Sequence, residues 1–144
     1  MINNKENTLL KSKHMALLTI LDETASGSIL RRLEVEIAQE MLTVRGLITQ
    51  RVHDEVPAYN AQQDGLFQGL VQPTESERVL NGYRLRPTKR IDAEQQVYRA
   101  LEAFQNNGFF LLVNDRQVET LDDEIWLGEG ATASFVRLTP LVGG

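Results

Sequence analysis

Alternation of apolar and charged residues in the segment RRLEVEI, residues 31–37, constrains the fold of this chain more than any other feature. The apolar residues at every second position are Leu33, Val35 and Ile37. In an extended strand they share one face, and Arg32, Glu34 and Glu36 share the other. The apolar run ALLTILDE before it also suits a strand, and Ser-Gly-Ser at 26–28 is a turn signal between the two. Together these segments predict an antiparallel hairpin with one solvated face.

Two later segments carry apolar residues at helical spacing. The first follows Thr43, a residue that can cap a helix, and its apolar positions are Val44, Leu47, Ile48, Val52 and Val56. We expect this helix to cover the hairpin, and to kink or stop near Pro57, which lacks the amide hydrogen that a helix needs. The second helix is expected over about 93–106, since Asp92 and Gln95 form a capping-box variant and Asn106-Asn107-Gly108 suits a helix end.

The rest of the chain divides into an irregular middle and a strand-rich end. Residues 59–90 show turn signals, with a short helix expected from Thr74 because Thr-Glu-Ser-Glu is a capping-box pattern. Residues 109–113, FFLLV, predict a central strand buried on both faces, followed by a turn at Asn114-Asp115. We expect an irregular crossing over 121–131 and a last strand over 132–138.

Composition restricts the classes of protein that this chain can belong to. A length of 144 residues, with 42% hydrophobic and 24% charged residues, suits one globular domain. The absence of cysteine excludes disulfides, thiolate metal sites and a cysteine nucleophile. A net charge of −5 argues against nucleic-acid binding, and no apolar run suits a signal peptide or a membrane span, so we expect a cytoplasmic protein with no membrane partner.

The order of these elements, and the final residues SFVRLTPLVGG, resemble the β-grasp, ubiquitin-like proteins. Residues 109–144 in particular are similar to the C-terminal half of the sulphur carriers of thiamin and molybdopterin synthesis. The resemblance implies an α+β fold, in which a mixed sheet packs on the main helix. The polar, lysine-rich residues 1–14 predict a flexible arm, followed by a domain at 15–139 and a projecting tail at 140–144.

This chain departs from the compact members of the family by a helix-containing insertion at about 59–108, before the third strand. The longer format is similar to bacterial ubiquitin-like modifiers that are encoded beside their own activating and conjugating enzymes. The insertion leaves open which activating enzyme the chain would fit.

The resemblance also implies a chemistry for the tail. An ATP-dependent adenylating enzyme would activate the Gly144 carboxylate, which would pass to sulphur or to an amine or hydroxyl of a target. Glycine at 143 and 144 would pass a narrow channel, because neither residue has a Cβ. Leu141 and Val142 would give an apolar grip, and Pro140 would end the last strand. The implied partners are an activating enzyme, a conjugating enzyme and a deconjugating peptidase, with no cofactor held by the chain.

A modifier could also be its own target. The amine acceptors available for self-conjugation are Lys5, Lys11, Lys13 and Lys89.

Other interpretations stay open beside this one. The chain could be an unconjugated β-grasp interaction module, in which a sheet surface around Phe135 or Trp126 binds a partner. An enzyme with a site in residues 59–90 is a third interpretation, although the usual nucleophiles and bases are missing or scattered. We therefore expect a substrate of enzymes, not an enzyme.

The remaining polar motifs are weak signals of a site. His14 and His53 are the only histidines, and a metal site normally needs three or four convergent ligands, so we expect no metal. Gly128-Glu129-Gly130 suits a turn. The carboxylates Asp122, Asp123 and Glu124 suit a solvated turn. The basic run of Arg84, Arg86, Lys89 and Arg90 suits a solvated segment or a surface for an acidic partner.

Overall fold

The computed structural model of the chain describes residues 16–138. The expected arm at 1–14 and the expected tail at 140–144 lie outside the described residues. The chain divides into two compact units, which we call the sheet unit, Met1–Val44 with Gly108–Gly144, and the helical unit, Arg45–Asn107. Among the described residues, no helix is long and apolar enough to cross a membrane.

The sheet unit begins with the predicted hairpin. Strand β1 (Ala16–Thr24) pairs antiparallel with β2 (Ile29–Ile37), and Leu18 lies opposite Val35. Gly27 in the connecting turn has a φ of +91°, a left-handed conformation that suits glycine. The sequence pattern therefore predicted both the pairing and the turn correctly.

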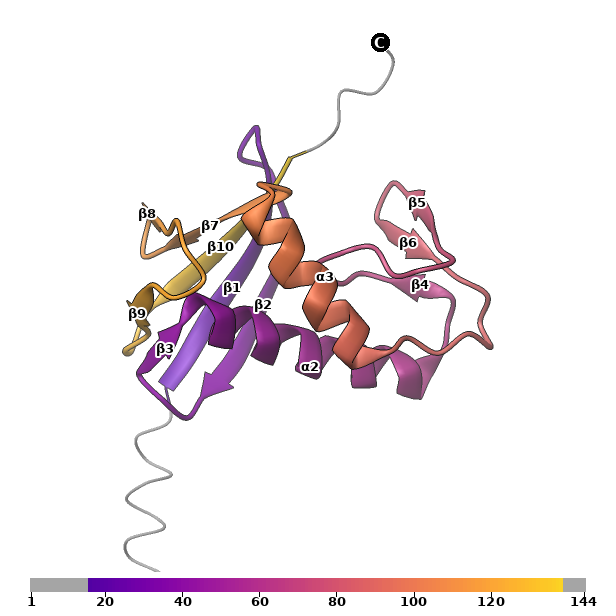
Figure 1. The fold of residues 1–144 in the computed structure, drawn as a ribbon, viewed down its shortest axis with the longest axis horizontal. Helices are drawn as coiled ribbons and strands as arrows, with labels where there is room; N and C mark the ends of the chain where they lie inside the picture. The colour runs from indigo at the N-terminus through magenta and orange to yellow at the C-terminus, as the bar shows by residue number, and fades with distance from the viewer. Residues whose placement is uncertain (1–15, 139–144) are drawn as a thin grey trace, which may run out of the picture. The chain divides into compact units, whose positions relative to one another are not determined.

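A five-stranded mixed sheet is built on this hairpin, in the order β2-β1-β10-β7-β8 (Figure 1). The last strand, β10 (Thr132–Arg137), lies parallel to β1 and antiparallel to β7 (Phe109–Val113). Strand β8 (Arg116–Gln117) pairs with β7 at the edge. The predicted mixed sheet of an α+β protein is confirmed, and it brings the first and last described strands of the chain side by side.

Strand β7 has one fully buried face. Phe109, Leu111 and Val113 are buried, whereas Phe110 and Leu112 are only half-buried. The expectation that β7 is buried on both faces is therefore wrong. The predicted turn after it is present, because Asn114 and Asp115 have φ of 50° and 66°, as a tight two-residue hairpin turn requires.

A second, two-stranded sheet in the sheet unit was not predicted. Strand β3 (Met41–Thr43) pairs antiparallel with β9 (Glu124–Trp126). Strand β9 lies within residues 121–131, which were expected to be irregular. Both strands are three residues long, which is too short for alternation to show in the sequence.

The two predicted helices are both present in the structure. Helix α2 (Val44–Gln62) begins after Thr43 as expected but continues through Pro57. Of the two predicted outcomes, the stop is wrong, and the kink stays a prediction. Proline removes one donor to the carbonyl four residues earlier, and that carbonyl belongs to the exposed His53, where water can bond it.

The second helix, α3, matches its prediction closely. It spans Ala93–Gln105, and the Asp92 side chain accepts a hydrogen bond from the Gln95 amide. Asn107 after the helix has a φ of 58°. The expected packing of the 44–56 helix on the hairpin would join the two units, and it stays a prediction.

The middle of the chain forms a three-stranded sheet in the helical unit. Its strands β4 (Leu66–Phe67), β6 (Gly82–Arg84) and β5 (Glu77–Val79) lie in that order. The short helix expected from Thr74 is wrong. Glu75 has a φ of 57°, which an α-helix excludes, and the chain turns there into β5.

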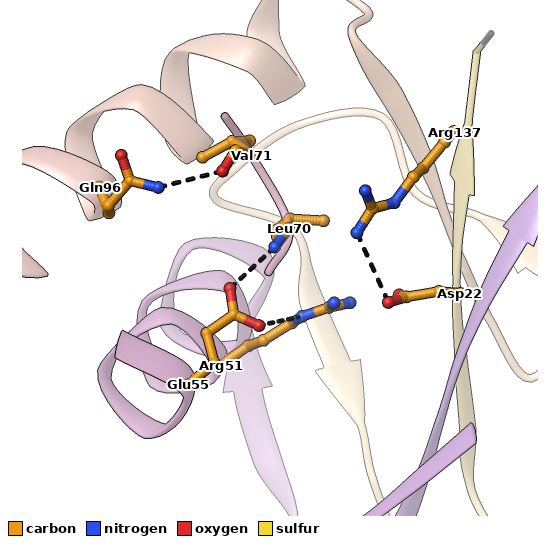
Figure 2. A network of polar contacts seen from close by, with 7 residues as sticks. All are labelled: Asp22, Arg51, Glu55, Leu70, Val71, Gln96 and Arg137. Atoms are coloured by element: carbon orange, nitrogen blue, oxygen red, sulfur yellow. Dashed lines mark hydrogen bonds and ion pairs between the residues drawn. The ribbon is translucent and has the colours of Figure 1, made fainter. Parts of the chain in front are cut away.

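Polar side chains of both helices hold one segment of the helical unit (Figure 2). Glu55 accepts a hydrogen bond from the Leu70 amide at 2.9 Å and pairs with Arg51 at 3.2 Å. Gln96 donates to the Val71 carbonyl at 3.1 Å. Arg51 and Gln96 are buried, so these bonds compensate for polar groups withdrawn from water.

Candidate interaction surface at β3 and β9

The proposed tail site lies outside the described residues. It comprises Pro140, Leu141, Val142, Gly143 and Gly144. The acceptor candidates Lys5, Lys11 and Lys13 lie outside them too. Lys89, Phe135 and Trp126 are described and are placed below.

Phe135 does not belong to an exposed surface. It lies in β10 opposite Asp22 of β1, and its side chain is fully buried. Its ring contacts that of Phe109, with centroids 5.8 Å apart. The prediction that Phe135 contributes to a partner surface is wrong, because β10 is an inner strand and Phe135 shares the buried face with Ala133.

Trp126, the other residue of that prediction, is exposed. It ends β9 opposite Met41 of β3 in the antiparallel register. The relative exposure of Trp126 is 56% and that of Met41 is 50%. Two large apolar side chains therefore stand as a cross-strand pair at the surface, which we call the Met41–Trp126 surface.

Gly128 leaves room for the indole ring of Trp126. A Cβ built on Gly128 would lie 2.1 Å from an atom of the Trp126 ring. Because only glycine leaves that space, the ring can lie against the backbone of the Gly128-Glu129-Gly130 segment. Gly130 has a φ of +82°, and the Ala131 amide donates to the Gly128 carbonyl, so this segment is the predicted turn.

The Gly128 contact gives a prediction. In Gly128→Ala the new methyl group displaces the ring, which is the end of a side chain that can rotate, so stability should fall by less than about 1 kcal/mol. The emission of the only tryptophan should shift to the red as its exposure rises. Glu129→Ala, a change at the exposed neighbour, should leave the spectrum unchanged. An identical spectrum for Gly128→Ala would contradict the contact.

Backbone bonds hold β9 beside its neighbours. The Leu127 amide donates to the Glu40 carbonyl at 2.6 Å, and the Val44 amide donates to the Asp123 carbonyl at 3.0 Å. The Asn114 side chain donates to the Trp126 carbonyl at 3.4 Å and accepts from the Thr132 amide at 3.0 Å. The β7–β8 turn thus connects the Met41–Trp126 surface to the main sheet.

Asp123 organises the turn that precedes β9. Its carboxylate accepts from the hydroxyl and amide of Thr120 and from the Glu119 amide. The hydroxyl and amide of Thr120, then the Glu119 amide, lower the pKa of Asp123 below its ordinary value. The solvated turn that the sequence predicted is therefore present at Asp122 and Asp123, whereas Glu124, the third carboxylate of that prediction, begins β9.

The lowered pKa predicts how acid affects this turn. Since the folded pKa is below the unfolded one, the bonds of Asp123 contribute fully above the ordinary value of 3.8, and the contribution is lost as pH falls through the lowered pKa. We expect the amide signals of Glu119 and Thr120 to move in that acid range. Asp123→Asn should abolish the movement, and a midpoint above 3.8 would contradict the assignment.

The two segments that carry this surface hold charges of one sign. Residues 33–44 carry three glutamates, and residues 117–136 carry five acidic residues. Neither segment contains lysine or arginine. A partner of the Met41–Trp126 surface therefore meets a negative field, which favours a basic segment.

One ion pair that the sequence analysis missed connects β1 and β10. Arg137 lies 3.6 Å from Asp22, which is 2% exposed (Figure 2). A sequence signal existed, because Asp22 follows Leu18 and Ile20 at the same two-residue interval and so falls in the buried phase of β1. The pair holds the end of β10 to β1.

The remaining predicted positions are dispersed. Lys89 pairs with Glu75 at 3.0 Å, with 40% of its side chain exposed, and His53 is exposed on α2. Arg84, Arg86 and Arg90 are exposed as well. Among residues 16–138, no group of three histidine, cysteine or acidic side chains is placed to hold a metal ion.

Comparison with known proteins gives no assignment. No protein-family model, no curated protein and no solved structure matches this chain.

Proposed function

We propose that this chain is a β-grasp, ubiquitin-like modifier or sulphur carrier, whose Gly144 carboxylate is activated by an ATP-dependent adenylating enzyme. The observation that carries the proposal is the topology of the sheet unit. A hairpin at the start of the unit lies beside its last strand, so β1 and β10 form a parallel pair inside a mixed sheet. This strand order supports the β-grasp proposal, which further expects the 44–56 helix to pack on the sheet and residues 59–108 to form an insertion.

The end of β10 supports the tail as the reacting segment. Ladder pairing with β1 continues to Arg137, which lies opposite Thr24. The Asp22–Arg137 pair at 3.6 Å ties this last pair of positions to the buried face of the sheet. Pro140, three residues further, cannot donate to a ladder, so a strand that continued there would lose a bond.

The chemistry proposed for the tail balances without a cofactor of the chain. A Gly144 carboxylate oxygen attacks the α-phosphorus of ATP, an acyl-adenylate forms and pyrophosphate leaves. A thiol sulphur or a target amine then displaces AMP from the acyl carbon, which gives a thioester or an amide. A persulphide sulphur gives an acyl disulphide instead, and a second thiol cleaves its S–S bond, which leaves the thiocarboxylate on Gly144 and a disulphide between that thiol and the enzyme's sulphur. The chain supplies the acyl group, and the partner enzyme supplies the acid, base and metal chemistry.

The test is incubation of the full chain with candidate activating enzymes and ATP, read by intact mass and by pyrophosphate release. Adenylate or thioester formed at Gly144 supports the proposal. A chain that stays unmodified with enzymes that activate other diglycine proteins, and that carries no adduct or thiocarboxylate at Gly144 in cells, overturns it.

A second candidate function is an unconjugated interaction module. The 56% exposure of Trp126, held beside Met41, is the observation that favours it. This function predicts that Trp126→Ala abolishes partner capture and that loss of Gly143 and Gly144 does not.

A modifier function predicts where the chain can be modified by itself. Self-conjugates through lysine should map to Lys5, Lys11, Lys13 or Lys89 alone, because no other lysine exists. Lys89 is 40% exposed but is paired with Glu75, so we expect a smaller share there. Peptide mapping of branched products measures these shares, and branching solely at Lys89 would contradict this expectation.

A further inference from the structure

We propose that residues 1–15 of this chain bind the Met41–Trp126 surface and cover it. The proposal is independent of the function proposed for the tail. Charge, apolar complementarity and chain reach all favour the chain's own first fifteen residues as the occupant of this surface.

The distribution of charge along the chain favours this contact. Residues 16–44 and 108–138 of the sheet unit carry eleven acidic and four basic residues, a net charge of −7. The helical unit, residues 45–107, carries eight of each and is neutral. Residues 1–15 carry Lys5, Lys11 and Lys13 against Glu6, a net charge of +2. The positively charged residues 1–15 are therefore attracted to the negatively charged sheet unit and not to the neutral helical unit.

The Met41–Trp126 surface and residues 1–15 are complementary in composition. The surface presents Met41 and Trp126, and Glu40, Glu124 and Glu129 nearby along the chain are exposed. The first fifteen residues contain a Leu9-Leu10 pair that is directly followed by Lys11. Leucines can cover the indole and thioether, while ammonium groups meet the carboxylates or the face of the ring.

Residues 1–15 are also long enough to reach this surface. Ala16, where the described chain begins, pairs with Ile37, and Met41 follows four residues later opposite Trp126. In Figure 1 the start of β1 lies at the end of the sheet where β3 and β9 pair. Ala16 is thus at most about 25 Å from Trp126 along this route. Leu9 and Leu10 can reach roughly that far from Ala16 when extended.

The chain offers an unusually specific experiment, because it has no cysteine and one tryptophan. A nitroxide attached to Thr8→Cys in the full chain would broaden the single indole N–H signal of Trp126 when residues 1–15 are bound. We expect a several-fold loss of that signal relative to the amide of Gly27, which lies at the opposite end of the β1–β2 hairpin. Equal intensity of the two signals would overturn the proposal.

Charge reversal tests the electrostatic part. Lys5→Glu, Lys11→Glu and Lys13→Glu together should restore the indole signal and raise acrylamide quenching of Trp126 by about twofold, because a half-exposed ring regains its free area. Lys89→Glu, a matched reversal in the helical unit, should change neither. Broadening that survives the triple reversal would overturn the role of the lysines.

A mixing experiment separates one chain from two. Nitroxide-labelled chain without ¹⁵N is added to unlabelled ¹⁵N chain, so that only contact between copies broadens the signal. No broadening is expected. Broadening equal to that within the labelled chain would replace the proposal by docking between copies.

Discussion

Removal of Gly143 and Gly144 should abolish activation of this chain, with at least a thousandfold loss expected by order of magnitude. The acyl group that attacks ATP would then be the Val142 carboxylate, two residues short of the active site. A displacement of this size costs more than the hundredfold attributed to an error of about 1 Å in placing a reacting group. The measurement is ATP-dependent pyrophosphate release with an activating enzyme that accepts the full chain.

Two controls make the result specific. Gly144→Ala keeps the length but adds a methyl group and restricts the backbone, so it should reduce activation strongly. Trp126→Ala alters the exposed surface of the sheet unit and should leave activation unchanged unless the enzyme binds there. Full activity of the chain without both glycines would overturn the modifier and carrier functions together.

The same tail separates a modifier from a sulphur carrier. Exchange of one carboxylate oxygen for sulphur adds about 16 Da at Gly144, because the acyl group is retained. A modifier would instead leave a branched peptide on a lysine of its target. Mass spectrometry of the C-terminal peptide from cells distinguishes these two products.

Long periodic segments made most of the fold predictable from the sequence. The alternation at 31–37 predicted β2 and its antiparallel pairing in a hairpin, and Asp92 with Gln95 predicted the start of α3. These patterns succeed because burial of one face imposes a period on the residues. The parallel pairing of β1 with β10 needs contacts between distant segments, and only the resemblance to a family suggested it.

Features that depend on tertiary contacts were missed. The β3–β9 pair and the three-stranded sheet of the helical unit use strands of two or three residues, in which no period can be recognised. The capping-box pattern at Thr74 is typical of a helix start, yet Glu75 has a positive φ and the chain turns there. Pro57 did not end α2, because the helix continues on both sides of it.

The sequence predicted the same exposure for Phe135 and Trp126, and the structure differs for Phe135. Both Phe135 and Trp126 are single aromatic residues in strands, and the sequence does not distinguish their exposure. The strand order does, because Phe135 lies in an inner strand on the buried face and Trp126 lies at the end of a short edge pair. Gly128 was recognised as a turn residue, but its role beneath the indole depends on a side-chain position that no spacing encodes.

Phe135→Ala should destabilise the protein by about 3–5 kcal/mol. The side chain is fully buried on β10, between β1 and β7, and loses its contact with the Phe109 ring. Its removal leaves a cavity in a sheet that cannot collapse easily, because β10 is paired on both edges. Urea denaturation followed by circular dichroism measures the change in the free energy of unfolding.

Two matched variants show whether burial is the cause. Phe135→Leu keeps most of the apolar volume and should cost clearly less, whereas Trp126→Ala removes a larger side chain that is 56% exposed and should change stability by less than about 1 kcal/mol. Because a small domain is stable by only about 5–15 kcal/mol, Phe135→Ala can reduce every activity by lowering the folded fraction. Partner binding lost in Trp126→Ala at full stability would instead identify a contact. If Trp126→Ala destabilised as much as Phe135→Ala, the indole would be a structural support and not a free surface.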